Sequence, residues 1–200
     1  MLDAWINLVI FAFLLLGSPG PAPMAVAATG AVFGFFQGLR FVAGLIAGFA
    51  LVLLLQAWGI SWLFSAYPMS QVWMKWAGVV YITWLAWKIA MVRPVTEPGV
   101  AAAAPGFVDG FVLNVINPKA YAALLVIYVE FLLPYSTPAK AYIMTGLVCW
   151  LLVVLIDLLW LVFGQFLRPL MLKPLPASLI RAGFALAMLI TVWWVVLMNG

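Results

Sequence analysis

Long apolar stretches, separated by short segments richer in polar residues, make up almost the whole chain. A helix rises 1.5 Å per residue, so about 20 consecutive apolar residues cross the roughly 30 Å hydrocarbon core of a membrane. Six stretches reach that length: residues 5–31, 41–64, 72–92, 107–133, 141–164 and 179–198. The pattern predicts an all-α integral membrane protein with six transmembrane helices.

Proline interrupts two of these stretches, the first and the fourth. The first interruption is Ser-Pro-Gly-Pro-Ala-Pro at residues 18–23, and the second is Asn-Val-Ile-Asn-Pro-Lys at residues 114–119. A proline removes one helix N–H group and clashes with the preceding turn, so each helix should break there. In lipid, the freed backbone groups need protein or water as partners. Broken membrane helices are typical of transporters, whose substrate sites lie at such breaks.

The two breaks fall at equivalent places in two halves of the chain. Each half holds three stretches, and its last helix begins with a basic residue shortly before Ala-Gly, at residues 75–78 and 181–183. Residues 93–106 contain three prolines and predict a linker. We therefore expect a first three-helix repeat at residues 1–92 and a second at residues 107–200. Because three spans reverse the direction of the chain, the repeats should be inverted relative to each other.

Composition agrees with a membrane protein and excludes several classes of function. Of the 200 residues, 68% are hydrophobic and 7% are charged, whereas soluble domains carry about 25% charged residues. The formal net charge is +4, but the basic residues are dispersed, so nucleic acid is not an expected partner. The chain has no His and a single Cys, Cys149, which excludes an internal disulfide and disfavours a His- or Cys-based metal site. We expect membrane lipid as the surroundings, with no metal and no cofactor.

Basic residues also predict which side of the membrane each loop faces. Those in or beside the connections before the second, fourth and sixth stretches are Arg40, Lys88, Arg93, Arg168, Lys173 and Arg181. The other side has only Lys75 and Lys140. Cytoplasmic loops carry the excess of Lys and Arg. The sequence therefore predicts a bacterial inner-membrane protein with both termini in the periplasm.

Two charged side chains fall well inside predicted spans, Asp157 in the fifth and Lys119 in the fourth. A charge facing lipid is costly, so both should face the bundle interior or a cavity. Asp157 could bind a coupling proton or cation, or it could form a structural ion pair. Lys119 could pair with Asp157 across the bundle. It could instead bind a substrate carboxylate at the N-terminus of a half-helix, where the helix dipole favours anions.

Polar groups beside the breaks are further candidate ligands. Asn114 and Asn117 supply amides at the second break, where they either satisfy freed backbone groups or line a site. Backbone N–H groups should be free at Gly20, Ala22 and the residues after Pro23 in the first break and at residues 119–121 in the second. Both breaks are therefore predicted to present donors to a central cavity.

Glycines recur at close to four-residue spacing after the first break, at Gly30, Gly34, Gly38, Gly44 and Gly48. Such ridges of small residues let membrane helices approach closely. They predict tight packing between the first two helices, with a homodimer interface as the alternative.

Several motifs together resemble the LysE/RhtB family of amino-acid exporters. They are Ser-Pro-Gly-Pro at residues 18–21 with the glycines that follow, KWAGVVYITWL at 75–85, GFVLNVINPKA at 110–120, Asp157, and Ala-Gly at 182–183. The resemblance spans nearly the whole chain. It implies six hydrophobic segments and efflux of amino acids or related metabolites driven by ion gradients. By this match, Asp157 would be the ion-coupling residue, and the substrate-binding positions would be Pro19, Gly20, Pro21, Asn114, Asn117, Pro118 and Lys119.

The chain departs from the family pattern at two places. Ala22 and Pro23 stand where the family often has Asn after Pro-Gly-Pro. The linker at residues 93–106 is short and nearly uncharged, whereas family members often carry a long charged loop there. Both departures leave the identity of the substrate open.

These features favour a secondary transporter that exports amino acids or closely related metabolites from the cytoplasm. We expect alternating access coupled to protons or another ion, with the substrate held at the two breaks. The alternative is an exporter of a metal cation or another small solute. An enzyme would need a nucleophile–base pair or a carboxylate cluster within the spans, and the sequence offers neither, so we expect no enzymatic activity.

Overall fold

Every regular element in the described part of the chain is an α-helix, as predicted. The computed structural model describes residues 2–57, 59, 66–91, 104–171 and 174–198. The helices are α1 (Leu2–Gly17), α2 (Pro21–Phe33), α3 (Phe35–Ala57), α5 (Pro68–Ala90), α6 (Phe107–Val115), α7 (Pro118–Glu130), α8 (Pro138–Met171) and α9 (Pro174–Met198).

Two described helices, α3 and α8, are each long and apolar enough to cross a membrane. The pairs α1–α2 and α6–α7 can each form one further span, although bends of 66° and 55° separate their two members. The described residues therefore hold two to four candidate spans of a multi-pass membrane protein. The other two predicted spans coincide largely with α5 and α9, which do not meet the same criteria over their described residues. The count of six spans and their inverted repeat stay predictions.

Both proline breaks are confirmed. The first lies between Gly17 at the end of α1 and Pro21 at the start of α2, and the second lies between Val115 of α6 and Pro118 of α7. A proline in the first turn of a helix loses no intrahelical hydrogen bond, and its fixed φ angle suits the helix. Both α2 and α7 begin in this way. The prolines that interrupt each predicted span therefore also begin the helix that follows the interruption.

The connection between the first two predicted spans is shorter than expected. Gly34 alone separates α2 from α3, so α3 begins several residues before the predicted span. Gly34 has a φ of 89°, a left-handed conformation that glycine adopts without steric cost. The amide of Phe35 donates to the side-chain oxygen of Gln165 in α8 at 2.8 Å. A sharp turn held by α8 therefore replaces the expected loop.

The glycines after the first break do bring helices close together, but not the predicted pair. A side chain on Gly30 would collide with the carbonyl oxygen of Leu161 in α8. A side chain on Gly44 would collide with the carbonyl oxygen of Phe107 in α6. The prediction that these glycines pack the first two helices against each other is wrong, because α2 and α3 turn their glycine faces toward α8 and α6.

Glycines of the second half complete the same two crossings. Gly164 of α8 lies against the backbone of Ala27, and Gly110 of α6 lies against the backbone of Phe41. Each crossing thus has small residues on both of its helices, which allows backbone-to-backbone contact. These contacts join α2 to α8 and α3 to α6 into tightly packed pairs.

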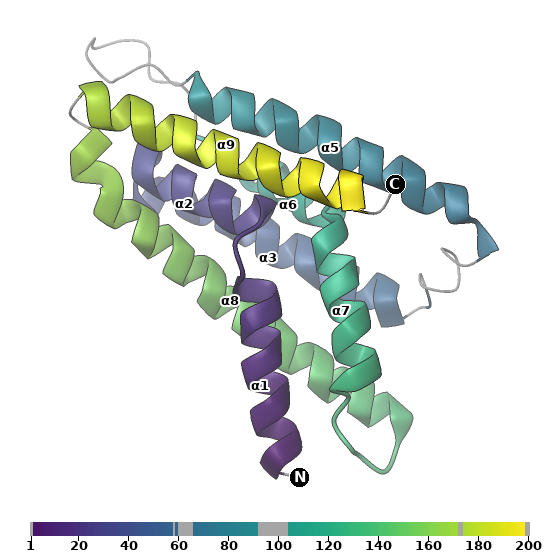
Figure 1. The fold of residues 1–200 in the computed structure, drawn as a ribbon. Helices are drawn as coiled ribbons and strands as arrows, with labels where there is room; N and C mark the ends of the chain where they lie inside the picture. The colour runs from purple at the N-terminus through teal and green to yellow at the C-terminus, as the bar shows by residue number, and fades with distance from the viewer. Residues whose placement is uncertain (1, 58, 60–65, 92–103, 172–173, 199–200) are drawn as a thin grey trace.

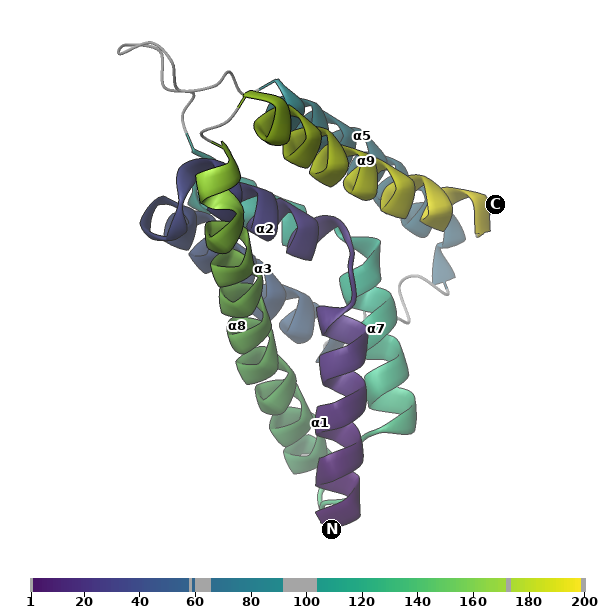
Figure 2. The same cartoon turned by 60° about the vertical axis from the view of Figure 1, so that its left-hand side comes forward.

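Helix α2 forms the centre of the fold, with residues 21–31 all buried. It lies among α3, α8 and α9, while α5 and α9 run side by side across one side of the molecule (Figures 1 and 2). The α2–α3 junction, the C-terminal end of α5 and the α8–α9 junction lie toward one end, and the N-terminus and the α7–α8 connection lie toward the other (Figure 1). The two breaks lie between these ends.

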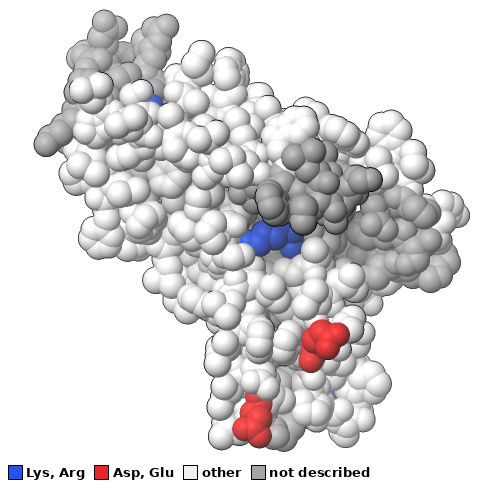
Figure 3. Space-filling model, viewed as in Figure 1, with Lys and Arg blue, Asp and Glu red and all other residues white. Residues whose placement is uncertain are grey.

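Charged groups are sparse on the face drawn in Figure 3. Basic atoms show near the middle of this face, and acidic groups show only toward the end that holds the N-terminus. Apart from a small basic spot near the upper left, most of the described surface in this view is uncharged, as expected of a protein surrounded by lipid.

Candidate functional site

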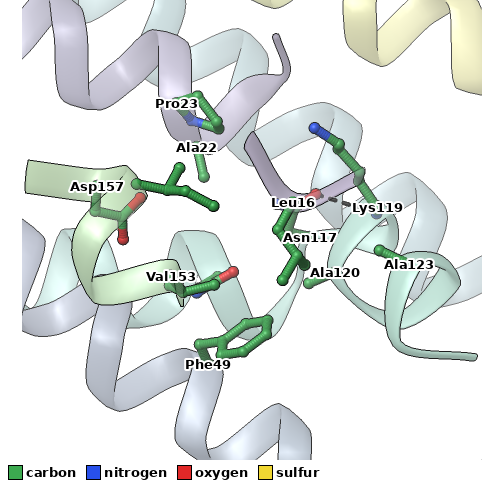
Figure 4. Close-up of a pocket in the computed structure, with 12 residues that line it drawn as sticks. Leu16, Ala22, Pro23, Phe49, Asn117, Lys119, Ala120, Ala123, Val153 and Asp157 are labelled. Carbon is green, nitrogen blue, oxygen red and sulfur yellow. Dashed lines mark hydrogen bonds between the residues drawn. The ribbon is translucent and has the colours of Figure 1, made fainter. Parts of the chain in front are cut away.

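A small cavity lies where the two breaks meet α3 and α8. Its volume is about 40 Å³, which has room for roughly three water molecules. The lining residues come from both breaks and both long helices (Figure 4): Leu16, Ala22, Pro23, Phe49, Asn114, Asn117, Lys119, Ala120, Ala123, Val153, Ile156 and Asp157. In this conformation the cavity has space for a few water molecules rather than for a larger molecule.

Some of the predicted site residues line the cavity, and the others lie at the two helix breaks beside it. The polar members of the lining are all among the predicted positions: Asn114, Asn117, Lys119 and Asp157. Gly20 is buried beside the side chain of Lys119. The prolines make the breaks themselves, at the exposed Pro19 and at the helix starts Pro21 and Pro118.

Sequence reasoning missed the apolar wall of the cavity. Phe49 of α3 and Val153 and Ile156 of α8 contribute to this wall. The spacing of Val153, four residues before Asp157, places both on one face of a helix and could have identified it. Phe49 carries no comparable signal. It lies in an apolar run of α3, and no polar residue of α3 accompanies it among the described lining residues.

The first break leaves backbone donors open toward the cavity. The N-cap residue of α2 is Gly20, which has no side chain to cap the helix. Among the described residues, the amides of Gly20 and Ala22 have no hydrogen-bond acceptor, and Ala22 lines the cavity. Open N–H groups and the positive end of the helix dipole make this terminus suitable for an anion. The expectation of free donors at the first break is met at Gly20 and Ala22, but it is wrong for Met24, whose amide donates to the carbonyl oxygen of Gly20 at 2.9 Å.

The carbonyl groups of the first break are bound by side chains from distant helices. Trp160 of α8 donates from Nε1 to the carbonyl oxygen of Gly17 at 3.2 Å. Lys119 of α7 donates from Nζ to the carbonyl oxygen of Ser18 at 2.5 Å. These carbonyls lie at the C-terminal end of α1, where the helix dipole favours a cation. Pro19 and Pro21 have no N–H groups, so the side chains supply donors that the local backbone lacks.

Gly20 leaves the space that the Lys119 side chain occupies. A Cβ atom on Gly20 would lie 3.0 Å from both Cδ and Nζ of Lys119. Contacts this short are tighter than usual, so the lysine side chain would have to give way by a few tenths of an ångström. The glycine therefore does two things: it opens the start of α2, and it seats the lysine ammonium against the first break.

The second break satisfies its own backbone. Asn117 caps α7, because its Oδ1 accepts from the amide of Lys119 at 3.2 Å and its carbonyl accepts from the amide of Ala120 at 3.1 Å. The hydroxyl of Tyr121 donates to the carbonyl of Val115 at 2.9 Å. The prediction of free amides at Lys119 and Ala120 is wrong, because the Asn N-cap already accepts from both.

Asn114 holds the second break to the neighbouring helix. Its Nδ2 donates to the carbonyl oxygen of Leu45 in α3 at 2.8 Å, and the side chain is buried. This contact lies beside the tight crossing of α3 and α6. Asn114 therefore fixes α6 on α3 as well as lining the cavity.

Asp157 lies on the opposite side of the cavity from Lys119 (Figure 4). The residue is 5% exposed, and its carboxyl group has no hydrogen-bond or ion-pair partner among the described residues. The ammonium of Lys119 binds Ser18 instead, so the direct Lys119–Asp157 ion pair, one of the two alternatives for Lys119, is not formed in this conformation. Both side chains do line one interior cavity, as expected from their depth in the sequence.

The arrangement offers complementary groups to a small molecule with both charges. One side holds the open amides of α2 and the Lys119 ammonium, which attract an anion. The other side holds Asp157, which attracts a cation. Apolar side chains lie between and around them. Among the described residues, no three His, Cys, Asp or Glu side chains come close enough together to hold a metal ion.

The family model that matches this chain is described as a translocator, and similar proteins are described as efflux proteins. The family model described as "LysE type translocator" matches residues 13–198. A cysteine/O-acetylserine efflux protein of Escherichia coli O157:H7 is 34% identical over 147 residues, which cover 68% of this chain and 74% of that protein. Proteins of the same description from Escherichia coli strain K12 and Shigella flexneri match with the same identity and coverage. No solved structure matches significantly.

Proposed function

The chain belongs to the LysE family of translocators, and on that premise we propose that it exports small neutral amino acids from the cytoplasm. Family membership makes it a membrane transporter rather than an enzyme. The relatives are described as efflux proteins for cysteine and O-acetylserine, so these two compounds are the first candidates for the substrate.

The observation that carries the proposal is that an open helix N-terminus lies across one cavity from a carboxyl group that has no partner among the described residues. The substrate carboxylate binds the amides of Gly20 and Ala22 together with the ammonium of Lys119. The substrate ammonium binds Asp157. A buried charge is tolerated when it has a partner, and the zwitterion supplies the partner that Asp157 lacks in the empty site.

The remaining lining supports a small uncharged side chain. Among the described lining residues, only Lys119 and Asp157 are charged, and both are used by the amino and carboxylate groups of the amino acid. Phe49, Val153 and Ile156 leave an apolar surface for the side chain. A strongly charged substrate side chain would find no partner there and would pay its full desolvation cost.

We further propose that Asp157 couples transport to an ion. A carboxyl group that binds the substrate ammonium in one step can bind a proton or another cation after the substrate leaves. Because the cavity has room for only a few waters, substrate entry needs the helices around it to move, as in alternating access. The inverted repeat is the architecture that would allow this movement, with α1–α2 and α6–α7 as the broken spans.

The proposed orientation places the α2–α3 and α8–α9 junctions in the cytoplasm of a bacterium and both termini in the periplasm. These junctions lie at one end of the molecule (Figure 1), and Arg40 and Arg168 are close to them in sequence, as the positive-inside rule requires. A phosphatase fused to the C-terminus should be active, and a fluorescent protein fused there should be dark. The reverse pattern would contradict this orientation.

Counterflow in proteoliposomes tests the transport proposal. Vesicles loaded with unlabelled O-acetylserine should accumulate labelled O-acetylserine through the wild-type protein. Asp157→Asn should reduce this accumulation to the level of empty vesicles, because a neutral amide cannot form an ion pair with the substrate ammonium. The matched control is Glu130→Gln, which changes an exposed carboxylate to an amide and should transport at the wild-type rate.

Two outcomes would count against the proposal. Counterflow of neither O-acetylserine, cysteine nor other neutral amino acids by the wild-type protein would remove the substrate class. Normal counterflow by a properly inserted Asp157→Asn protein would leave transport in place but return Asp157 to a structural role.

A further inference from the structure

We propose that Lys119 exchanges partners during each transport cycle. In the empty site its ammonium binds the Ser18 carbonyl and ties α7 to the first break. In the loaded site it binds the substrate carboxylate, and the first break is released. This inference rests on the proposed function and names the residue through which substrate binding loosens the closed conformation.

The first step of the argument is that the Lys119–Ser18 bond joins two separate broken spans. Lys119 lies in the first turn of α7, and Ser18 lies just after α1. Their hydrogen bond spans 101 positions of sequence. A substrate that removes this bond therefore removes a hydrogen bond between two broken spans, rather than rearranging a single loop. The apolar contacts between α1 and α7 remain.

The second step is that the two side chains holding the first break differ in their ability to move. Trp160 has a single donor on a rigid ring, and that donor is used by Gly17. Lys119 has three donors on a flexible four-carbon chain, and it lines the cavity. Trp160 is therefore the fixed support of the break, and Lys119 is the support that can turn toward a ligand.

The third step is that the lysine already lies beside the anion position. The Nζ atom is 3.0 Å from where a Cβ of Gly20 would be, and the open amides of Gly20 and Ala22 are the groups that would receive a carboxylate. A carboxylate bound there comes within hydrogen-bond reach of the ammonium. Both bonds use the charged ammonium, but a carboxylate adds the attraction of a full negative charge, so it competes well with a neutral carbonyl for the lysine.

The consequence is a coupling between binding and opening. A ligand shifts a conformational equilibrium only when it binds one state better than the other. Here the substrate gains its best partner only in the state where Lys119 has left Ser18. An amino-acid ester, which has no carboxylate, should bind weakly and should leave the Lys119–Ser18 bond in place.

Solid-state NMR on the full chain in lipid bilayers measures this exchange directly. The protein is labelled with ¹⁵N at lysine Nζ and with ¹³C at serine carbonyls, and the dipolar coupling between the two labels is recorded. Ser18 is the only serine followed by proline, so a second sample with ¹⁵N-proline identifies its carbonyl signal without a mutation. The probes are O-acetylserine labelled with ¹³C at its carboxylate, and its unlabelled methyl ester.

The empty protein should show a lysine coupling to the Ser18 carbonyl. Saturating O-acetylserine should abolish this coupling and create a lysine coupling to the substrate carboxylate, whereas the methyl ester should leave the Ser18 coupling unchanged. Gly20→Ala should weaken the Ser18 coupling even without substrate. Gly183→Ala, at a glycine with open space around its Cβ position, should not.

The results separate this inference from the proposed function. A Ser18 coupling that persists while O-acetylserine binds, as judged by thermal stabilisation, would overturn the exchange and leave export intact. Absence of the coupling in the empty protein would overturn it as well. If no amino acid stabilises the protein, the proposed function fails, and the exchange fails with it.

Discussion

At the first break, carbonyl groups that follow α1 accept hydrogen bonds from side chains of distant helices, whereas at the second break the first amides of α7 are bound by a residue of the break itself. At the first break, the carbonyls of Gly17 and Ser18 depend on Trp160 and Lys119. At the second, Asn117 caps the helix that follows it. A break whose backbone is hydrogen-bonded by its own residues keeps its shape when other helices move. A break whose backbone is hydrogen-bonded by other helices does not. We therefore regard the first break as the adaptable part of the site and the second as its support.

One residue accounts for much of this difference. Asn117 precedes Pro118 and occupies the N-cap position, where Asn is among the most favourable residues. Gly20 precedes Pro21 at the corresponding position of the first break and offers no side-chain acceptor. Both helices begin with a proline. The first amides of α7 are bound by Asn117, whereas the amide of Ala22 in α2 has no acceptor among the described residues.

Replacing the lysine should have the largest effect on the adaptable break. Lys119→Met removes the donor to Ser18 and the proposed partner of the substrate carboxylate. Because a hydrogen bond to a charged group contributes roughly 1.5–3 kcal/mol, counterflow of O-acetylserine should fall about 10- to 100-fold. Lys140→Met, at an exposed lysine whose ammonium lies over the ring of Tyr135, is the control and should transport normally. Equal rates for the two variants would remove Lys119 from the site.

Filling the space at Gly20 should also have a large effect, seen in substrate binding. Gly20→Val should abolish O-acetylserine binding, and Gly20→Ala should weaken it about tenfold, because a Cβ pushes the Lys119 side chain from its place. Ligand-induced thermal stabilisation measures this binding. The control Gly183→Ala adds a methyl group in open space and should bind normally. Wild-type binding by Gly20→Val would show that the break is only a packing feature.

Removing the fixed support should affect stability more than transport. Trp160→Phe deletes the donor to Gly17 and should cost about 1 kcal/mol of stability, or roughly 2–4 °C in melting temperature, measured in detergent. The buried Nε1 of Trp150 has no partner in the described part of the chain. Trp150→Phe should therefore cost less than Trp160→Phe. A larger loss for Trp150→Phe would contradict the role given to the Trp160 hydrogen bond.

The smallest effect is expected at the self-supporting break. Asn117→Ala loses the cap of α7 and should cost about 1 kcal/mol of stability, while Asn117→Ser, which keeps an acceptor, should cost only a few tenths. Chemical unfolding in detergent compares the two. Affinity for O-acetylserine should change less than about threefold in Asn117→Ser, because the second break donates no free amide to the substrate. A loss of affinity as large as that of Gly20→Ala would erase the distinction between the breaks.

The sequence predicted the parts of the site that follow from local chemistry. Prolines at residues 19, 21 and 118 determine where helices end and begin, and the lone acidic residue deep in a span, Asp157, had to face the interior. The capping role of Asn117 was also accessible from its place before Pro118, yet the same position was read as a source of free amides at Lys119 and Ala120.

What the sequence could not predict depends on how distant segments meet. The glycines of α2 and α3 signalled close packing but not its partners, because Gly164 and Gly110 lie in the other half of the chain. The contact of Trp160 with Gly17 joins residues 143 positions apart, and no spacing rule connects them. The sharp turn at Gly34 likewise needs α8, whose Gln165 binds the first amide of α3.

Hydrogen–deuterium exchange at the two breaks tests the central claim most directly, namely that an amino acid binds the open terminus of the first break. Exchange is followed by mass spectrometry in peptides covering residues 14–24 and 112–122, with and without saturating O-acetylserine. The account predicts slower exchange in the first peptide, because the carboxylate covers the amides of Gly20 and Ala22, and unchanged exchange in the second. Protection of the second peptide alone, or of neither peptide in a sample that O-acetylserine stabilises, would contradict it.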